Sequence, residues 1–401
     1  MEFTYCKLID VLSNIHSGGT PSTRESSYWG GKIKWLSSGE TSQRFISDTI
    51  DKITDEGVKN SSTKLASKGS IVMACAGQGK TRGQTSYLLD DMYINQSVIA
   101  LETNESVLPL YLFYDLSSRY EELRGGSDAS STRGSITTTS LKNLSFKYPD
   151  LSTQQSIVDI LWGYDSLIEA NNRRIELLEQ AAQELYKEWF VRFRFPGYEA
   201  TKFENGLPSE WERKQLGDMI AFNPTITAKG ATGFRSIPMA ALSTNNMVID
   251  ESLITSTDAL SGSRSQNLDT LLARITPCLE NGKTGFVFGL KEHEVAGGST
   301  EFIVMRSKSL TPYFVYFLAR SDTFREYAIS SMNGADGRQR AKVDRLEKLW
   351  WLQPPQKRLE QFDSKVKGSL ELIHALTHQN QNLAAQRDML LPRLMSGKLE
   401  V

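Results

Sequence analysis

An internal repeat is the feature that most constrains how this 401-residue sequence can fold. When VLPLYLFYDL (107–116) is placed over LTPYFVYFLA (310–319), proline, aromatic and aliphatic positions coincide at an offset of 203 residues (310 − 107). At the same offset Cys75 falls on Cys278. Self-similarity over such a distance indicates two copies of one structural unit, so each motif has to be interpreted in both copies.

The repeat decides how a motif similar to a phosphate-binding loop is interpreted. Residues 74–81 end in Gly-Lys-Thr but lack one glycine of that loop, which holds phosphates where a helix begins directly after it. Strand-like sequence follows in both copies, and the second copy has Pro277 in place of the first loop glycine. We therefore expect Lys80 and Lys283 to lie in equivalent tight hairpin turns. Nucleotide hydrolysis is therefore the weakest of the functional hypotheses considered for this chain.

Length and composition set the domain organisation. One hydrophobic core serves at most about 250–300 residues, so this chain is expected to hold at least two domains. Residues 152–192 contain no proline and a single glycine, which predicts a long helix with Ser152 or Thr153 as its N-cap. The predicted fold is α+β, with mixed, strand-rich domains at 1–150 and 195–351, each followed by a long helix, at 151–194 and 352–401.

The two predicted helices carry heptad patterns, which favour an antiparallel coiled coil with a pseudo-twofold internal repeat. The seam of the first helix is Leu161, Tyr164, Ile168, Asn171, Ile175, Leu178, Ala182, Leu185 and Trp189. The seam of the second is Phe362, Val366, Ser369, Ile373, Leu376, Asn380, Leu383, Arg387 and Leu390. If Asn171 faces Asn380, paired numbers sum to 551, and Ile168 then meets Leu383. We expect Pro392 to end the second helix near Leu391.

Charge, cysteine spacing and hydropathy exclude several classes of protein. The formal net charge of −1 neither supports nor excludes a nucleic-acid partner, because a basic patch can be balanced elsewhere. The three cysteines lack the spacing of a disulfide framework or a zinc site. No apolar segment approaches the roughly 20 residues of a membrane span, and no signal peptide is visible, so we expect a cytoplasmic protein without a membrane partner.

The sequence shows no catalytic constellation, so we expect a non-catalytic chain. FNPT (222–225) falls short of the Asn-Pro-Pro-aromatic motif with which an adenine methyltransferase would hold a flipped base. His374 and His378 stand at i and i+4 on the second predicted helix, a spacing that offers two ligands to a metal. Because no third ligand is near in the sequence, a solvated helix face is the favoured interpretation, and no metal site is predicted.

Several segments resemble the DNA-specificity subunit of type I restriction–modification systems. They are SGGTPS (17–22), YWGGKIKWLSSGE (28–40), the helix over 153–178 with its repeat at 355–380, and LLPRLMSGKLEV (390–401). The resemblance implies that each globular domain is a target-recognition domain that reads one half of a split double-stranded DNA target. It also implies that the helices separate the two halves and dock two methylation subunits.

The resemblance further implies a restriction and translocation subunit, held through the methylation subunits. S-adenosylmethionine, ATP and Mg²⁺ would bind those partner subunits, so no cofactor is expected on this chain. A protein-interaction scaffold, with two duplicated binding domains on a helical spacer, remains the alternative function. The second domain lacks the Gly-Gly-Thr-Pro and Trp-Gly-Gly elements of the first, as two domains that read different sequences should.

Candidate DNA contacts follow from side-chain chemistry. Bases are recognised by Arg, Lys, Asn and Gln, and phosphates by Lys, Arg, Ser, Thr and backbone N–H groups. The candidates in Gly-, Ser- and Thr-rich stretches of the first domain are Thr20, Ser22, Arg24, Lys80, Arg82, Gln84 and Arg133. Those in the second domain are Asn223, Arg235, Lys283, Arg338 and Arg340. We expect these two groups to line the DNA-facing sides of their domains.

Overall fold

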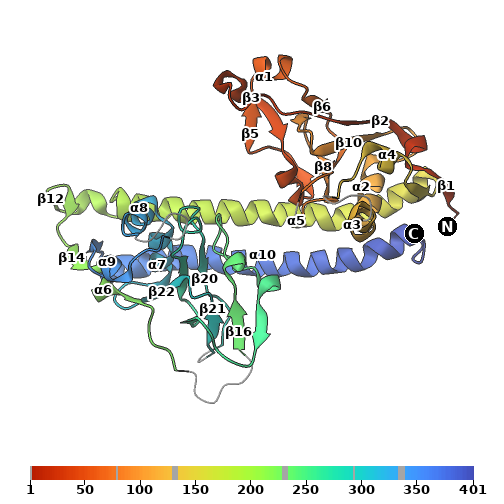
Figure 1. Cartoon of the computed structure of the whole chain (residues 1–401). Helices are drawn as coiled ribbons and strands as arrows, with labels where there is room; N and C mark the ends of the chain where they lie inside the picture. Colours follow the sequence, from red (N-terminus) through yellow and green to blue (C-terminus); the bar gives the residue numbers. More distant parts are fainter. Residues whose placement is uncertain (1, 78–79, 129–133, 228–233, 292–293, 333–338) are drawn as a thin grey trace. The chain divides into compact units, whose positions relative to one another are not determined.

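The computed structural model describes residues 2–77, 80–128, 134–227, 234–291, 294–332 and 339–401 (Figure 1). Contacts divide the chain into two compact units. The first unit is Met1–Leu167 together with Leu383–Val401, and the second is Ile168–Asn382. Each unit therefore combines one globular domain with a stretch of both long helices. No helix among the described residues is long and apolar enough to cross a bilayer.

The first unit holds two mixed sheets. One has the order β2 (Leu12–Ser17), β10 (Val98–Thr103), β7 (Ile71–Ala74), β8 (Thr85–Leu88) and β4 (Phe45–Ile46). The other has the order β5 (Asp51–Ile53), β3 (Trp29–Leu36), β9 (Met92–Ile94) and β6 (Lys64–Ala66). β7 is apolar throughout and β10 nearly so; β7 is fully buried, as expected for central strands with both faces covered.

Short helices and a small ribbon complete the first unit. They are α1 (Asp55–Lys59), α2 (Pro109–Ser118), α3 (Tyr120–Asp128), α4 (Thr138–Lys142), and the antiparallel pair β1 (Thr4–Lys7) and β11 (Ser145–Tyr148). α2 begins at a proline, where the missing N–H costs no hydrogen bond. It buries Tyr111, Phe113 and Tyr114 in the same hydrophobic cluster as β7 and β10.

The second unit repeats most of these elements in the same order, without counterparts of β4 and α1. Its first sheet runs β15 (Ile220–Phe222), β22 (Phe302–Ser307), β19 (Thr270–Ala273) and β20 (Thr284–Phe286). Its second runs β17 (Thr255–Thr257), β16 (Phe234–Ile237), β21 (Ala296–Gly298) and β18 (Ser263–Ser265). The remaining elements are the ribbons β14 (Glu212–Gln215) with β23 (Trp350–Gln353) and β12 (Phe203–Glu204) with β13 (Leu207–Pro208), and the helices α6 (Leu216–Met219), α7 (Pro312–Arg320), α8 (Asp322–Ser330) and α9 (Val343–Glu347).

The predicted internal repeat is confirmed by strand order and direction. The order β2-β10-β7-β8 corresponds to β15-β22-β19-β20, and β5-β3-β9-β6 corresponds to β17-β16-β21-β18. Even the parallel pair within each second sheet recurs, as β3 with β9 and as β16 with β21. Lys80 and Lys283 both lie between antiparallel neighbours, β7 with β8 and β19 with β20. These connections span 75–84 and 274–283, so the prediction of tight turns was wrong in length.

The two long helices form as predicted, but their ends differ from expectation. α5 spans Leu151–Tyr186 and continues as one π-helical segment, Lys187–Val191, while α10 spans Gln356–Ser396. Asp150, rather than Ser152 or Thr153, caps α5, because its Oδ1 accepts hydrogen bonds from the N–H groups of both residues (3.0 and 3.1 Å).

The expectation that Pro392 ends the second helix was also wrong, because Pro392 lies inside α10. A proline in a helix interior removes one N–H donor and ordinarily breaks the helix. Here Leu391, Leu394 and Met395 are buried in the core of the first unit. Burial of these side chains offsets the lost hydrogen bond, so the helix continues for one more turn.

In the second unit the paired helices show the predicted register. Asn171 Nδ2 donates to Asn380 Oδ1 at 2.9 Å, and the rings of Trp189 and Phe362 lie 6.0 Å apart. Because the partner numbers fall as those of α5 rise, the helices run antiparallel there. Seam residues Ile175, Ala182, Val366, Ile373 and Leu376 share one buried cluster. The layer of Ile168 with Leu383 joins the two units and stays a prediction.

Candidate nucleic-acid interface

An open groove of about 560 Å³ lies on the first unit. Three segments form it: the turn before β4, the β7–β8 connection and the junction of α2 with α3. Its lining residues are Thr41, Ser42, Arg44, Lys80, Gly83, Gln84, Thr85, Ser117, Tyr120, Glu121 and Arg124. Hydroxyl, amide and cationic groups dominate this lining. Such groups suit a sugar–phosphate strand and base edges better than an apolar ligand.

Hydrogen bonds fix several of these groups in place. Arg124 Nη1 donates to Tyr120 Oη at 2.8 Å, and Tyr120 Oη in turn donates to the Lys80 carbonyl at 2.8 Å. This chain ties α3 to the β7–β8 connection. The Lys80 residue is exposed. Arg44 is partly committed to the protein, since its Nη2 lies 3.3 Å from Asp165 Oδ2 and its guanidinium lies over the Phe113 ring.

Of the predicted first-domain residues that the structure describes, it brings two together, because Lys80 and Gln84 both line this groove. Arg82 was predicted to face DNA but is buried, 7% exposed, with Nη1 donating to the Gly134 carbonyl at 3.0 Å. A side chain held inside the domain in this way serves to fix the segment at Gly134. The lysine two residues earlier remains available to a ligand.

Thr20, Ser22 and Arg24 do not line this groove. Thr20 donates to Gln96 Oε1 at 2.5 Å, which ties the segment after β2 to the β9–β10 turn. Ser22 and Arg24 are exposed on the following loop, where the Ser22 carbonyl accepts from Trp29 Nε1 at 3.1 Å. Arg133 lies outside the described residues. A DNA contact by any of these residues stays a prediction.

A second open groove, of about 430 Å³, lies on the second unit. Of the predicted second-domain residues within the described ranges, Asn223 alone lines it. The Asn223 backbone has a φ of 46°, and its Oδ1 accepts from the Val304 N–H at 2.9 Å, so the residue continues the pairing of β15 with β22. The cations at this groove are Arg264 and Arg274, neither of which was predicted. Arg264 lies within the short strand β18, and Arg274 directly follows the buried strand β19, so a search for polar loop clusters passes over both.

Three further second-domain candidates, Arg235, Lys283 and Arg340, are described by the structure, and each has a protein partner. Arg235 on β16 lies 3.7 Å from Glu251, and Lys283 Nζ donates to the Met239 carbonyl at 3.3 Å. Arg340 contacts Glu301 through Nε and Nη2, at 2.6 to 3.0 Å. The hydrogen bonds from Arg340 hold the pKa of the Glu301 carboxyl below its usual range. Arg338 lies outside the described residues, and DNA binding by this group stays a prediction.

The two copies differ at one residue that lines the first groove, Ser117. Ser117 on α2 corresponds to Arg320 on α7 at the repeat offset (320 − 117 = 203). Arg320 Nη1 donates to the Thr244 and Gly282 carbonyls at 2.8 and 3.2 Å. In the second copy the arginine side chain therefore bridges the end of α7 to two neighbouring loops. The short serine cannot reach so far, and Ser117 Oγ is buried without a hydrogen-bond partner among the described residues. One scaffold therefore presents two different surfaces.

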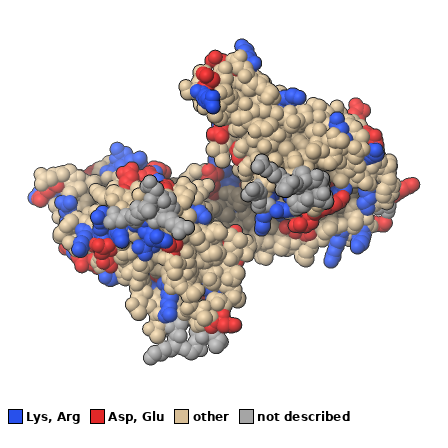
Figure 2. All heavy atoms as spheres, viewed as in Figure 1, with Lys and Arg blue, Asp and Glu red and all other residues tan. Residues whose placement is uncertain are grey.

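Figure 2 shows Lys and Arg side chains interspersed with Asp and Glu side chains on the visible face. This distribution matches the formal net charge of −1. A broad basic surface of the kind that binds any nucleic acid is not visible on that face. The candidate interface is better defined by the two grooves and their individual cations.

Comparison with known proteins gives one consistent result. Residues 2–180 match the family described as type I restriction modification DNA specificity domain. The chain is 27% identical to the type I restriction enzyme MjaIX specificity subunit of Methanocaldococcus jannaschii, with 98% of this chain and 93% of that protein aligned. It is 31% identical to the EcoR124I/EcoR124II specificity subunit of Escherichia coli, over 47% of this chain and 48% of that one.

A solved structure shares the fold. The S subunit of a type I restriction–modification system from M. genitalium superposes with a TM-score of 0.57 at 13% identity, over 98% of this chain and 96% of that one. Residues 2–180 of this protein therefore carry a type I restriction modification DNA specificity domain, and the chain is similar along nearly its whole length to a type I restriction enzyme specificity subunit.

Proposed function

We propose that this chain is the non-catalytic, sequence-specific DNA-binding subunit of its restriction–modification complex, and that each globular domain reads one half of a bipartite target. The observation that carries the proposal is the duplicated scaffold with two differently lined grooves. A common scaffold suits a common ligand, double-stranded DNA, while differences such as Ser117 against Arg320 suit different base sequences.

In the groove of the first unit, Lys80 and Gln84 suit different parts of the DNA. An exposed lysine such as Lys80 suits a phosphate, which it would bind as a point charge without regard to sequence. The half-buried amide of Gln84 suits the edge of an adenine, to which it can present a donor and an acceptor together. Lys80 would then contribute affinity, and Gln84 specificity.

We further propose that the chain recruits two methylation subunits and, through them, the restriction and translocation subunit. The repeat supports this stoichiometry, because two copies of one structural unit offer two equivalent docking surfaces. S-adenosylmethionine, ATP and Mg²⁺ would be bound by those partners. The complex would act on DNA in the cytoplasm.

The test uses the chain assembled with the methylation subunits of its own system. Methylome sequencing of the host, with and without this gene, should reveal a bipartite adenine-methylated motif that depends on it. Fluorescence anisotropy then measures affinity for a duplex with that motif at several salt concentrations. A complex that binds the motif no better than a scrambled duplex would favour the protein-interaction scaffold.

Variants in the groove make the test specific. Lys80→Ala should weaken binding to all sequences and reduce the slope of log affinity against log salt by about one. Gln84→Ala should cost about 1–3 kcal/mol on the cognate duplex and relax one base position. The matched control is Lys59→Ala, an exposed lysine on α1 that does not line the groove, and its slope should stay that of the unaltered protein.

A further inference from the structure

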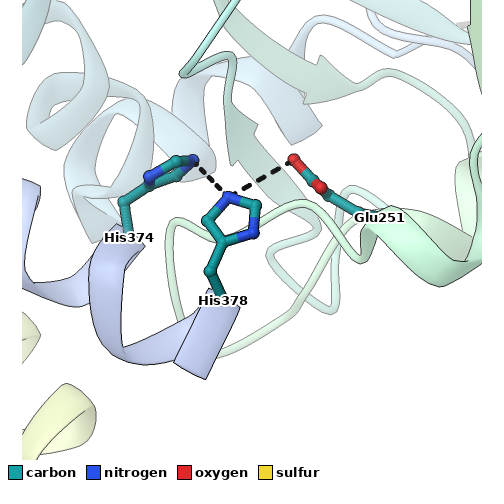
Figure 3. A group of neighbouring side chains, drawn as sticks. All are labelled: Glu251, His374 and His378. Carbon is teal, nitrogen blue, oxygen red and sulfur yellow. Dashed lines mark hydrogen bonds and ion pairs between the residues drawn. The ribbon is translucent and has the colours of Figure 1, made fainter. Parts of the chain in front are cut away.

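Three metal-ligating side chains converge in the second unit (Figure 3). His374 and His378 lie one turn apart on α10, and Glu251 begins the short 3-10 helix Glu251–Leu253, more than a hundred residues earlier in the chain. His378 Nε2 lies 3.0 Å from His374 Nε2 and 3.7 Å from Glu251 Oε1. All three ligand atoms lie within 4.8 Å of one another. The fold thus supplies the third ligand that the sequence spacing alone did not reveal.

We propose that Glu251, His374 and His378 bind one Zn²⁺ ion, which fastens the second globular domain to α10. Zn²⁺ prefers imidazole nitrogen and carboxylate oxygen at about 2.0–2.2 Å in tetrahedral geometry. Such bonds place neighbouring ligand atoms roughly 3.3–3.5 Å apart. The two shorter separations, 3.0 and 3.7 Å, lie on either side of this range. The third separation, between the ligand atoms of Glu251 and His374, shortens toward this range if the Glu251 side chain turns toward His374.

The surroundings favour a bound cation over a simple hydrogen-bonded pair. Two imidazoles that face each other through Nε2 can share only one proton, whereas a metal ion uses both lone pairs at once. The Phe288 ring lies 4.7 Å from the His374 ring and helps to hold its orientation. Arg235 lies 3.7 Å from the same Glu251 oxygen, a separation at which an ion pair competes only weakly with a metal bond.

A cavity beside the three ligands provides room for a fourth ligand. It has a volume of about 40 Å³, and its walls include Glu251, His374 and His378 among aliphatic and aromatic side chains. A cavity of more than roughly 15 Å³ accepts a water molecule when polar partners are present. One water bound to the ion would complete a tetrahedral set of two nitrogens and two oxygens.

The first experiment titrates Zn²⁺ into the full chain after dialysis against a chelator. Isothermal titration calorimetry should show one Zn²⁺ per chain, and saturating Zn²⁺ should raise the melting temperature by roughly 5 °C. Co²⁺ in place of Zn²⁺ should give the intense visible absorption of a tetrahedral site. The unaltered chain suffices here, so the lack of a one-to-one complex would overturn the proposal without any variant.

Variants then assign the ligands. His374→Gln, His378→Gln and Glu251→Gln should each weaken Zn²⁺ binding at least tenfold and abolish the rise in melting temperature. The matched control is His16→Gln, since His16 lies in the first globular domain, where its Nε2 contacts the Leu65 carbonyl. Binding that is unchanged in any of the three ligand variants, or lost in the control, would show that the ion is held elsewhere.

Discussion

Replacing the asparagine layer of the helix pair tests the register most directly. Asn171 is 1% exposed, and its Nδ2 donates to both Asn380 Oδ1 (2.9 Å) and Gln379 Oε1 (3.1 Å). Asn380 Nδ2 donates in turn to Asn172 Oδ1 at 2.9 Å. Both amides are therefore satisfied only while each faces the other helix in this register.

The contacts predict unequal effects of the two single substitutions. Asn171→Leu leaves the buried Asn380 Oδ1 without its donor, at a cost of about 1–3 kcal/mol. Asn380→Leu costs less, because Asn171 keeps Gln379 and the Asn172 side chain is exposed to water. The double variant removes both buried amides and packs two leucines, so its free energy of unfolding should equal or exceed that of the unaltered protein.

The assay is urea unfolding followed by far-ultraviolet circular dichroism, with the four proteins forming a double-mutant cycle. The expected coupling energy between the two substitutions is about 1–3 kcal/mol. Additive costs, with the double variant the least stable of the four, would refute the argument that the two amides satisfy each other. A costlier Asn380→Leu than Asn171→Leu would refute the hydrogen-bond assignment.

The remaining predictions concern single buried groups. Asp165→Asn should destabilise the first unit by about 3–5 kcal/mol in urea unfolding, because it leaves the buried Arg387, 2.5 Å away, without its main counter-charge; equal stability would refute this. Burial raises the pKa of Asp115 to about 6, so its carboxyl favours the native state below about pH 4 and loses that contribution as the pH rises through 6. Asp115→Asn should therefore add up to about 3 kcal/mol at pH 7 and almost nothing at pH 4, and a gain that is independent of pH would contradict it. Pro392→Ala should raise stability by roughly 1–3 kcal/mol by restoring the N–H inside α10, which thermal unfolding can check.

The architecture could be predicted from the sequence because its signals are periodic. The offset of 203 residues between the copies recurs in the strand orders, and the heptad pattern recurs in the Asn171–Asn380 contact. The exact ends of the two long helices could not be predicted in the same way, because they depend on individual side-chain contacts. Asp150, itself a good N-cap residue, stands two positions before the predicted Ser152. The end at Pro392 was overridden by burial of neighbouring side chains, which a local rule does not include.

The candidate sites could not be predicted in the same way, because they depend on contacts between distant segments. Lys80 and Arg82 stand in one polar stretch, yet Arg82 is buried because it reaches the Gly134 carbonyl from 52 residues away. Glu251 meets His378 only through the fold of the second unit. Local composition indicates which side chains are able to bind a ligand. It does not indicate which of them the protein already uses for its own contacts.

The helix pair is held in each unit by a tyrosine from the helix that begins at the repeated proline. In the first unit Tyr114 on α2 donates to Asp165 on α5 at 2.9 Å. In the second, Tyr316 on α7 donates to Glu179 on α5, whose carboxyl pKa is raised by burial. Neither anchor includes Lys80 or Gln84, whereas Arg44, which also lines the first groove, contacts the same Asp165 oxygen as Tyr114 at 3.3 Å. Substitution of Lys80 or Gln84 should therefore leave the domain in place on the helices. Loss of a tyrosine anchor, in contrast, should lower stability without changing the preferred DNA sequence.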